Sequence, residues 1–246
     1  MESSEGADRP VRLDDADFSG TRLHSPNFEG SRITDGWLRN ADISGYIEGL
    51  RVNGVEVAPL IEAELDRCWP ARVKLRSTDP AGLAEGWDVI EDVWRATVER
   101  ARKLPGALLS ERVDDDWSFV ETLRHLISAT DGWLLRMVRQ LPRPYHPYGL
   151  APPFLTDTAD LGIDPDAHPS MEEVLVVRRE HMDMVRETID ALTADELGRM
   201  CEPPDASGYP TEAHSVLKCL HVILDEEWGH SRYANRDLAI LEARSR

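Results

Sequence analysis

The sequence predicts a mainly α protein, in which a four-helix bundle follows a short repetitive segment. Two observations predict the bundle. Four stretches of about 20 residues carry apolar residues at helical spacing, and two of them open with a Ser-x-x-Glu capping box. A third observation sets the first segment apart: its apolar residues recur with a period of five. Neither a helix nor a flat strand has that period.

The composition argues against several classes of function. The net charge of −18 at pH 7 disfavours binding to nucleic acid or to an anionic membrane surface. The chain lacks an apolar run long enough for a membrane span and begins without the pattern of a signal peptide, so we expect a cytoplasmic location. The 3 Cys have no paired spacing, which indicates reduced thiols.

Residues 1–10 are interpreted as a flexible leader and residues 11–57 as a repeat segment. Within the repeat segment, large apolar residues recur at every fifth position: Leu13, Phe18, Leu23, Phe28, Ile33, Leu38 and Ile43. Mostly small residues stand two positions earlier, beginning with Val11. The pattern resembles the pentapeptide repeat, which implies a short right-handed β-helix with both positions inside; coincidental spacing is the alternative. Fewer than two coils would form, so we expect a structural cap or a dimer element that needs a neighbour.

Turn and helix signals then organise the rest of the chain. Asn53-Gly54 predicts a hairpin turn, and Pro59 opens a short helix that leads into a linker, so that residues 58–80 connect the two parts. The bundle is assigned to residues 81–246. Its helices are expected at about residues 83–104, 118–137, 170–188 and 214–234, and residues 236–243 are expected to continue as a tail helix.

The fourth helix carries the main candidate site. Glu226 and His230 stand four residues apart, and therefore on one face, in a stripe of mostly apolar residues. A charged group on a core-facing stripe needs a partner, because an unpaired buried charge is costly. A divalent metal ion is one such partner. His125 on the second helix is the candidate third ligand, since two His and one carboxylate form a known catalytic zinc set.

Other interpretations of these residues remain open from spacing alone. His125 and His230 are otherwise core histidines, satisfied by Glu121, by Glu226 or by a backbone carbonyl. Glu227 lies three residues before His230 and competes with Glu226 as the carboxylate ligand, although Glu226 keeps better phase with the apolar stripe.

Four residues are candidates for catalysis. His181 lies on the apolar stripe of the third helix, either as a fourth ligand or proton shuttle or as a buried, hydrogen-bonded side chain. Glu227 and His181 are the candidate bases of a hydrolase. Tyr145 and His146 stand beside Arg143 in the unusually long connection at residues 139–169, where a lid would reach the metal. A surface loop tied down by Pro is the alternative.

Two segments resemble the ligand motifs of the DinB-like family, whose superfamily includes mycothiol-dependent maleylpyruvate isomerase. Residues 117–126 (WSFVETLRHL) are similar to the first motif and residues 225–233 (DEEWGHSRY) to the second, and the resemblance covers about residues 80–240. It implies a DinB-like four-helix bundle. Many members have His at the position of Glu226. A Glu at this position resembles the isomerase branch of the family, which uses Glu-x-x-x-His. The resemblance thus implies three ligands for zinc or nickel: His125, Glu226 and His230.

The family resemblance also implies a function. Members of known activity use the metal to activate a low-molecular-weight thiol, so we expect a metal- and thiol-dependent transferase or isomerase that acts on an electrophilic small molecule. Arg far outnumbers Lys, which is typical of a high-GC genome and makes mycothiol the natural thiol. The alternatives are a metal-dependent hydrolase and a non-enzymatic, stress-associated bundle with a structural metal and an interaction role. Dimers are common in the family, although this sequence does not itself predict a homodimer.

Overall fold

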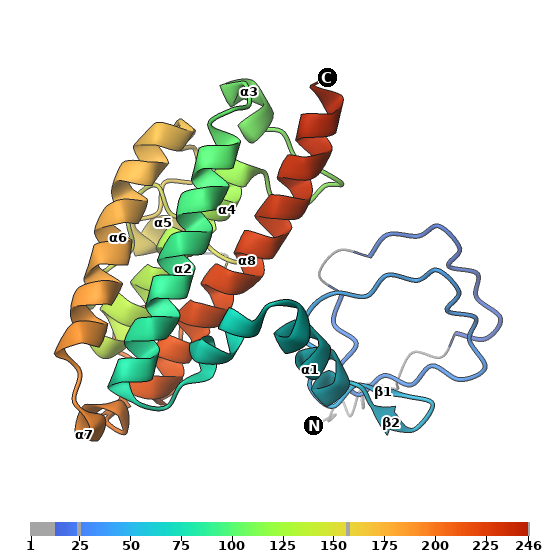
Figure 1. The fold of residues 1–246 in the computed structure, drawn as a ribbon, viewed down its shortest axis with the longest axis horizontal. Helices are drawn as coiled ribbons and strands as arrows, with labels where there is room; N and C mark the ends of the chain where they lie inside the picture. Colours follow the sequence, from blue (N-terminus) through green and yellow to red (C-terminus); the bar gives the residue numbers. More distant parts are fainter. Residues whose placement is uncertain (1–12, 24–25, 156–157, 246) are drawn as a thin grey trace, which may run out of the picture. The chain divides into compact units, whose positions relative to one another are not determined.

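The computed structural model describes residues 13–23, 26–155 and 158–245. The chain divides into two compact units, residues 1–43 and 44–246. Helices dominate the second unit, which confirms the predicted mainly α class (Figure 1). Over the described ranges, no helix combines the length and the apolar character that a membrane crossing requires. The predicted leader and Val11 lie outside the described residues.

The described part of the first unit contains neither a helix nor a strand (Figure 1). Its turns recur every ten residues, each closed by one backbone hydrogen bond: Thr21 N to Phe18 O, Ser31 N to Phe28 O and Ala41 N to Leu38 O. The large apolar residues of the repeat are between 53% and 68% exposed. The predicted β-helix, with these residues inside, is therefore not supported. Fewer than two coils leave each apolar side chain without the neighbouring coil that would cover it.

A β-hairpin stands near the start of the second unit. Strand β1 (Arg51–Val52) pairs with the antiparallel strand β2 (Val55–Glu56). Asn53 and Gly54 between them have φ values of 49° and 81°. Two successive positive φ angles are what a two-residue hairpin turn requires, so the turn predicted from Asn-Gly is confirmed.

Two short helices lead from the hairpin to the bundle. Helix α1 (Ala58–Cys68) has Pro59 in its first turn, as predicted. Pro is tolerated there because the first N–H groups of a helix have no intrahelical partner. The following 3-10 helix η1 (Pro70–Arg76) replaces the predicted linker. Its Leu75 is buried and η1 packs on helix α2 (Pro80–Ala101), so this segment belongs to the bundle wall.

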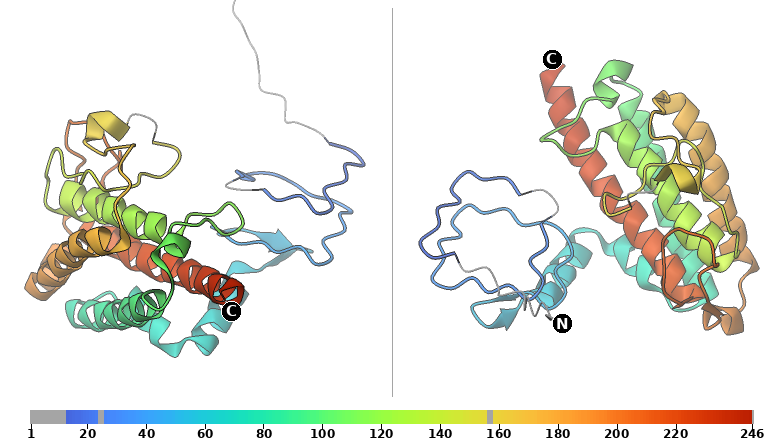
Figure 2. Two further views of the ribbon diagram at one scale, coloured as in Figure 1. Left: turned by 90° about the horizontal axis from the view of Figure 1, so that it is seen from above. Right: turned by 180° about the vertical axis from the view of Figure 1, so that it is seen from behind.

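Four long helical segments form the bundle in Figures 1 and 2. They are α2, α4 (Phe119–Thr130) continued by the π-helix η2 (Asp131–Val138), α6 (Met171–Ala191) and α8 (Val216–Arg244). Helices α2 and α4 each pack against both α6 and α8. Their apolar stripes meet in one core, which includes Leu83, Trp87, Ile90, Leu123, Leu126, Ile127, Leu134, Val174, Leu220 and Ile223.

Capping boxes define the starts of two bundle helices. The side chain of Ser118 accepts a hydrogen bond from the backbone of Glu121, and the Glu121 carboxylate accepts one from the backbone of Ser118. Ser170 and Glu173 repeat this arrangement at the start of α6. Both boxes were predicted from sequence, because the motif satisfies donors that a helix start otherwise leaves free.

The structure adds two details to the predicted helices. The second helix widens into a π-helix at Asp131, where the side chains of Asp131 and Arg136 are buried and take their hydrogen-bond partners from other segments. The predicted tail helix is continuous with the fourth helix, since α8 runs unbroken to Arg244. Leu238 and Leu241 prolong its buried stripe, so packing on the bundle supports the extra turns.

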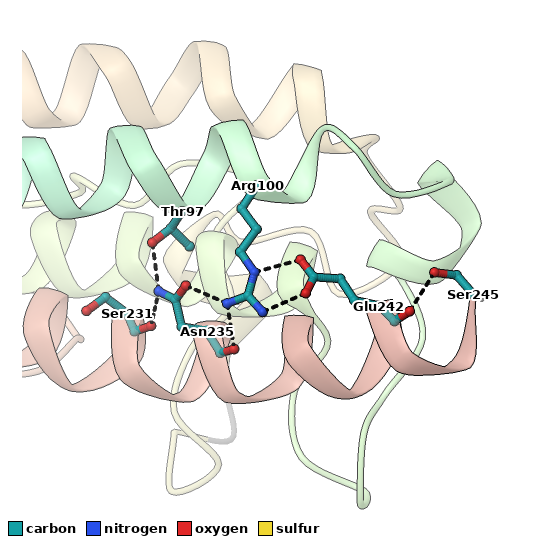
Figure 3. A network of polar contacts seen from close by, with 6 residues as sticks. All are labelled: Thr97, Arg100, Ser231, Asn235, Glu242 and Ser245. Carbon is teal, nitrogen blue, oxygen red and sulfur yellow. Dashed lines mark hydrogen bonds and ion pairs between the residues drawn. The ribbon is translucent and has the colours of Figure 1, made fainter.

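A polar network joins the C-terminal halves of α2 and α8 (Figure 3). Arg100 donates from Nε and Nη2 to the two carboxylate oxygens of Glu242, at 2.7 and 2.9 Å. The amide of Asn235 donates to Thr97 Oγ1 at 2.8 Å. Asn235 lies five residues after His230 on α8, so these contacts help to fix the rotation of the helix that carries the candidate ligands.

Shorter elements occupy the connections. They are helices α3 (Gly106–Leu109), α5 (Thr158–Leu161) and α7 (Ala194–Leu197), and strands β3 (Met200–Cys201) and β4 (His214–Ser215), which pair with each other. The connection at residues 139–169 contains α5 and its own apolar cluster of Tyr145, Leu161 and Ile163. Side-chain packing therefore holds part of this long connection in place.

Candidate metal centre

Three side chains from two helices converge on one point. His125 comes from α4, and Glu226 and His230 come from α8. One potential ligand atom of each residue lies within 4.8 Å of those of the other two. The Nε2 atoms of His125 and His230 are 3.4 and 3.2 Å from the same oxygen, Oε2 of Glu226. The structure thus brings together the three residues that the sequence predicted as ligands.

Local structure explains this convergence. The capping box at Ser118 starts α4, and His125 lies seven residues later, about two turns along the helix. Glu226 and His230 are one turn apart on α8, so their side chains leave the same face. The packing of α4 on α8 then brings the two faces together.

The orientation of His125 is set by a backbone carbonyl. Its Nδ1 is 3.1 Å from the oxygen of Leu150, which can only accept a hydrogen bond. We therefore assign a proton to Nδ1, which donates to this carbonyl. Nε2, the other ring nitrogen, then faces the Glu226 carboxylate at 3.4 Å. A hydrogen bond of this kind to the distal nitrogen is typical of metal-binding His, because it fixes the tautomer and the ring direction.

The Glu226 carboxylate is held in its ionised form. Burial raises the pKa of this carboxyl, but hydrogen bonds and positive charge from His125 and His230 outweigh burial and hold the pKa well below its usual range. Two imidazole nitrogens and one carboxylate oxygen are ligands that zinc and similar divalent ions accept. The donor set therefore fits such an ion.

One side of the cluster remains accessible to solvent. The side chains of His125, His230 and Glu226 are 9%, 18% and 33% exposed. Among the described His, Cys, Asp and Glu residues, the group with ligand spacing has these three members and no fourth. An ion held by three protein ligands would keep a coordination position for a small molecule.

Aromatic rings cover another side of the cluster. The Trp117 ring lies 4.4 Å from the ring centre of His125 and 5.8 Å from that of His230. Tyr233 makes an edge contact with His230 at 6.1 Å. Trp117 was not predicted to be a site residue. The available signal was its place directly before the N-cap of the helix that carries His125.

The structure separates the two neighbouring glutamates. Glu227 is 1% exposed and points to α6, where both of its oxygens accept hydrogen bonds from Arg178 at 2.7 and 2.8 Å. Glu226 is the carboxylate that meets the two histidines. Glu226 was thus predicted as the carboxylate of the cluster, although Glu227, and not Glu226, lies on the buried stripe of α8.

His181 belongs to a different polar cluster. Its Nε2 is 2.8 Å from Oδ1 of Asp131, and its Nδ1 is 2.9 Å from the carbonyl oxygen of Val177. Both side chains of the His181–Asp131 pair are almost completely buried. Among the sequence-based alternatives, this geometry matches the buried, hydrogen-bonded His rather than a fourth ligand.

Tyr145 and His146 also make structural contacts. The Tyr145 hydroxyl donates to the carbonyl of Tyr209 and accepts from its N–H. The backbone N–H of His146 donates to Asp131, and its Nδ1 accepts from the N–H of Tyr148. The long connection does reach the candidate centre, as predicted, but through the carbonyl of Leu150 rather than through these two side chains.

Comparison with known proteins identifies the family. The model of the DinB superfamily matches residues 90–234. Two solved structures are similar in part: a Streptococcus pneumoniae protein with 20% identity, covering 64% of this chain and 88% of that one (TM-score 0.44), and an uncharacterised Clostridium difficile 630 protein with 17% identity, covering 64% and 94% (TM-score 0.45). No curated protein matches. Because the family match spans more than half of its residues, the chain belongs to the DinB superfamily.

Proposed function

We propose that this protein is a divalent-metal-dependent transferase or isomerase that uses a low-molecular-weight thiol and an electrophilic small molecule. One observation carries the proposal: two imidazoles and one carboxylate converge on a partly exposed point, with no fourth ligand among the described residues. Structural zinc sites are normally closed by four protein ligands, whereas catalytic sites keep one position for water or substrate.

The chemistry of thiol transfer makes use of such a site. A divalent ion, zinc or nickel, would lower the pKa of a thiol in the open position and so supply a thiolate at neutral pH. The residues of the chain would bind the ion and orient its ligands. His125 and His230 direct Nε2 to the ligand point, and the ionised Glu226 offsets part of the positive charge. Trp117 covers the two rings on one side. Mycothiol is the thiol that the family resemblance suggests.

The contacts of the other candidate residues argue against hydrolysis. The predicted hydrolase would use Glu227 or His181 as a general base close to the metal-bound water. Both oxygens of Glu227 are bound to Arg178, and both ring nitrogens of His181 are bound in the buried cluster with Asp131. Neither candidate base is free to take a proton at the triad. A thiol that is already deprotonated needs no such base.

The first test is the metal content of the purified protein by elemental mass spectrometry, followed by turnover assays with paired thiols and electrophiles. We expect about one equivalent of zinc or nickel per chain, and loss of the electrophile only when the metal and a thiol such as mycothiol are both present. A protein that stays metal-free after incubation with both ions would overturn the proposal. Turnover of esters or amides without thiol would instead favour the hydrolase.

A further inference from the structure

A five-residue segment of the long connection, residues 146–150, lies against α4, and we name it the strap. Each backbone N–H and C=O group of the strap has a hydrogen-bond partner. These partners include Asp131 at its start and His125 at its end, 2.9 and 3.1 Å away. A segment with all its backbone groups satisfied is strongly specified in position. The strap therefore presents the Leu150 carbonyl to His125 as a fixed acceptor.

Arg124 is the side chain that holds the strap to α4. It is only 7% exposed, and its Nε and Nη2 donate to the carbonyls of Tyr148 and Gly149 at 3.0 and 3.3 Å. The Leu150 N–H donates back to the carbonyl of Arg124 at 3.1 Å. Within the described part of the chain, no carboxylate forms an ion pair with Arg124. Burial accordingly lowers the pKa of its guanidinium.

Stability alone gives little reason to bury an arginine in this way, because a buried charge without a direct ion pair is costly, and the carboxylates of Glu121 and Asp164 favour its charge only from a distance. Its place in the chain suggests another role. Arg124 directly precedes His125, and the strap carbonyls bound by Arg124 directly precede the carbonyl that binds His125 Nδ1. Arg124 and His125, which are adjacent on α4, thus form hydrogen bonds with three consecutive carbonyls of the strap.

We propose that Arg124 is a positioning residue for the metal centre: by clamping the strap, it keeps the Leu150 carbonyl on Nδ1 of His125 and so directs Nε2 to the ligand point. This inference rests on the metal site of the proposed function. Its structural half, the tautomer of His125, exists without metal. Failure of the inference can therefore be distinguished from failure of the proposed function.

The test compares two buried arginines. Arg136 is 2% exposed and also binds only loop carbonyls, those of Pro204, Ala206, Ser207 and Pro210. Arg124→Met and Arg136→Met therefore remove the same kind of clamp, the first at the strap and the second elsewhere. For each variant, the protonated ring nitrogen of His125 is identified in the metal-free protein by 15N NMR, and zinc affinity is measured by competitive titration.

We expect Arg124→Met to bind zinc about 10- to 100-fold more weakly than the parent, the usual effect of losing an outer-shell partner of a metal ligand. His125 in this variant should lose its fixed Nδ1–H tautomer. Arg136→Met should keep both the parental tautomer and the parental zinc affinity. Equal zinc affinities in both variants, or an Nε2–H tautomer in the metal-free parent, would overturn the proposal. A parent that binds no zinc but has the Nδ1–H tautomer would overturn only the proposed function.

A second variant covers the case in which Arg124→Met does not fold. A Cβ atom on Gly149 would lie 2.5 Å from Oγ of Ser128 and 3.1 Å from the carbonyl oxygen of His146. Gly149→Val should therefore push the strap away from α4 while leaving Arg124 in place. We expect the same loss of tautomer and of zinc affinity. A folded Gly149→Val protein with parental zinc affinity would contradict a positioning role for the strap.

Discussion

Two clusters of histidine and carboxylate lie in the same bundle, and their histidines are held alike. Nδ1 of His125 faces the carbonyl of Leu150 at 3.1 Å, and Nδ1 of His181 faces the carbonyl of Val177 at 2.9 Å. In both clusters, Nε2 then faces a carboxylate oxygen from another helical segment. The contacts of the two histidine rings therefore do not by themselves distinguish the two clusters.

The carboxylates make the difference. Asp131 is 0% exposed, and its two oxygens are occupied separately, by His181 Nε2 at 2.8 Å and by the N–H of His146 at 2.9 Å. Glu226 is one-third exposed, and a single oxygen faces two imidazoles at 3.2 and 3.4 Å. The cluster of His181 and Asp131, which we call the closed cluster, has its hydrogen-bonding groups satisfied within the protein. The cluster of His125, Glu226 and His230 instead gathers three electron-rich atoms around one point and leaves a side open.

The comparison shows that a histidine on a core stripe is better classified by its carboxylate partner than by its own burial. A buried carboxylate with a hydrogen bond on each oxygen is satisfied without a metal ion. A carboxylate oxygen shared between two imidazoles needs a proton or a cation between them. Substitutions made in both clusters test this distinction, because the two clusters should respond differently.

The largest expected effect is on metal content. His125→Ala and His230→Ala should each reduce bound zinc or nickel from about one equivalent to almost none, because two remaining ligands hold such ions weakly. His181→Gln, the matched change in the closed cluster, should keep the full equivalent. Elemental mass spectrometry of the three purified variants decides this, and metal loss from a folded His181→Gln protein would count against the separation of the two clusters.

The adjacent glutamates should differ in stability. Glu227→Gln leaves the buried charge of Arg178 without its counter-charge, so the free energy of unfolding should fall by about 3–5 kcal/mol. Glu226→Gln removes a partly exposed carboxylate, and the metal-free protein should lose less stability than the Glu227→Gln variant, because solvent screens the contacts of Glu226 with the two histidines. Urea denaturation of the metal-free proteins measures both values. A larger loss for Glu226→Gln than for Glu227→Gln would reverse the assignment of their roles.

The closed cluster itself should respond by a smaller amount. Asp131→Ala removes both acceptor oxygens, so the N–H of His146 loses its partner. An unsatisfied buried group costs about 1–3 kcal/mol, and urea denaturation should show a loss in this range. An unchanged free energy of unfolding would mean that the pair contributes nothing to the fold.

The smallest expected effect concerns the aromatic cover. Trp117→Leu removes the ring that packs on both candidate ligands, and an aromatic contact of this kind is worth about 0.5–1.5 kcal/mol. Zinc affinity should therefore fall by up to about tenfold, as measured by competitive titration. Trp37→Leu, at a position that is 89% exposed, is the control and should leave the affinity unchanged. Equal affinities in both variants would remove Trp117 from the site.

Much of the fold could be predicted from the sequence, because helix starts and turns depend on neighbouring residues. The capping boxes at Ser118 and Ser170 and the turn at Asn53-Gly54 occur where the motifs indicated. The repeat segment shows the limit of this reasoning. Its five-residue period is unambiguous, yet burial of its apolar residues would need contacts that a period alone does not supply.

The candidate site divides in the same way. Helical spacing placed Glu226 and His230 on one face, His125 on the second helix was the candidate third residue, and the family motif then implied the same three residues. Only the tertiary structure decided that Glu227 turns to Arg178 and that the long connection contributes a carbonyl. Spacing along one helix follows from local geometry. The partner of a buried polar group depends instead on which distant segment packs against it, and this choice is made only when the helices come together.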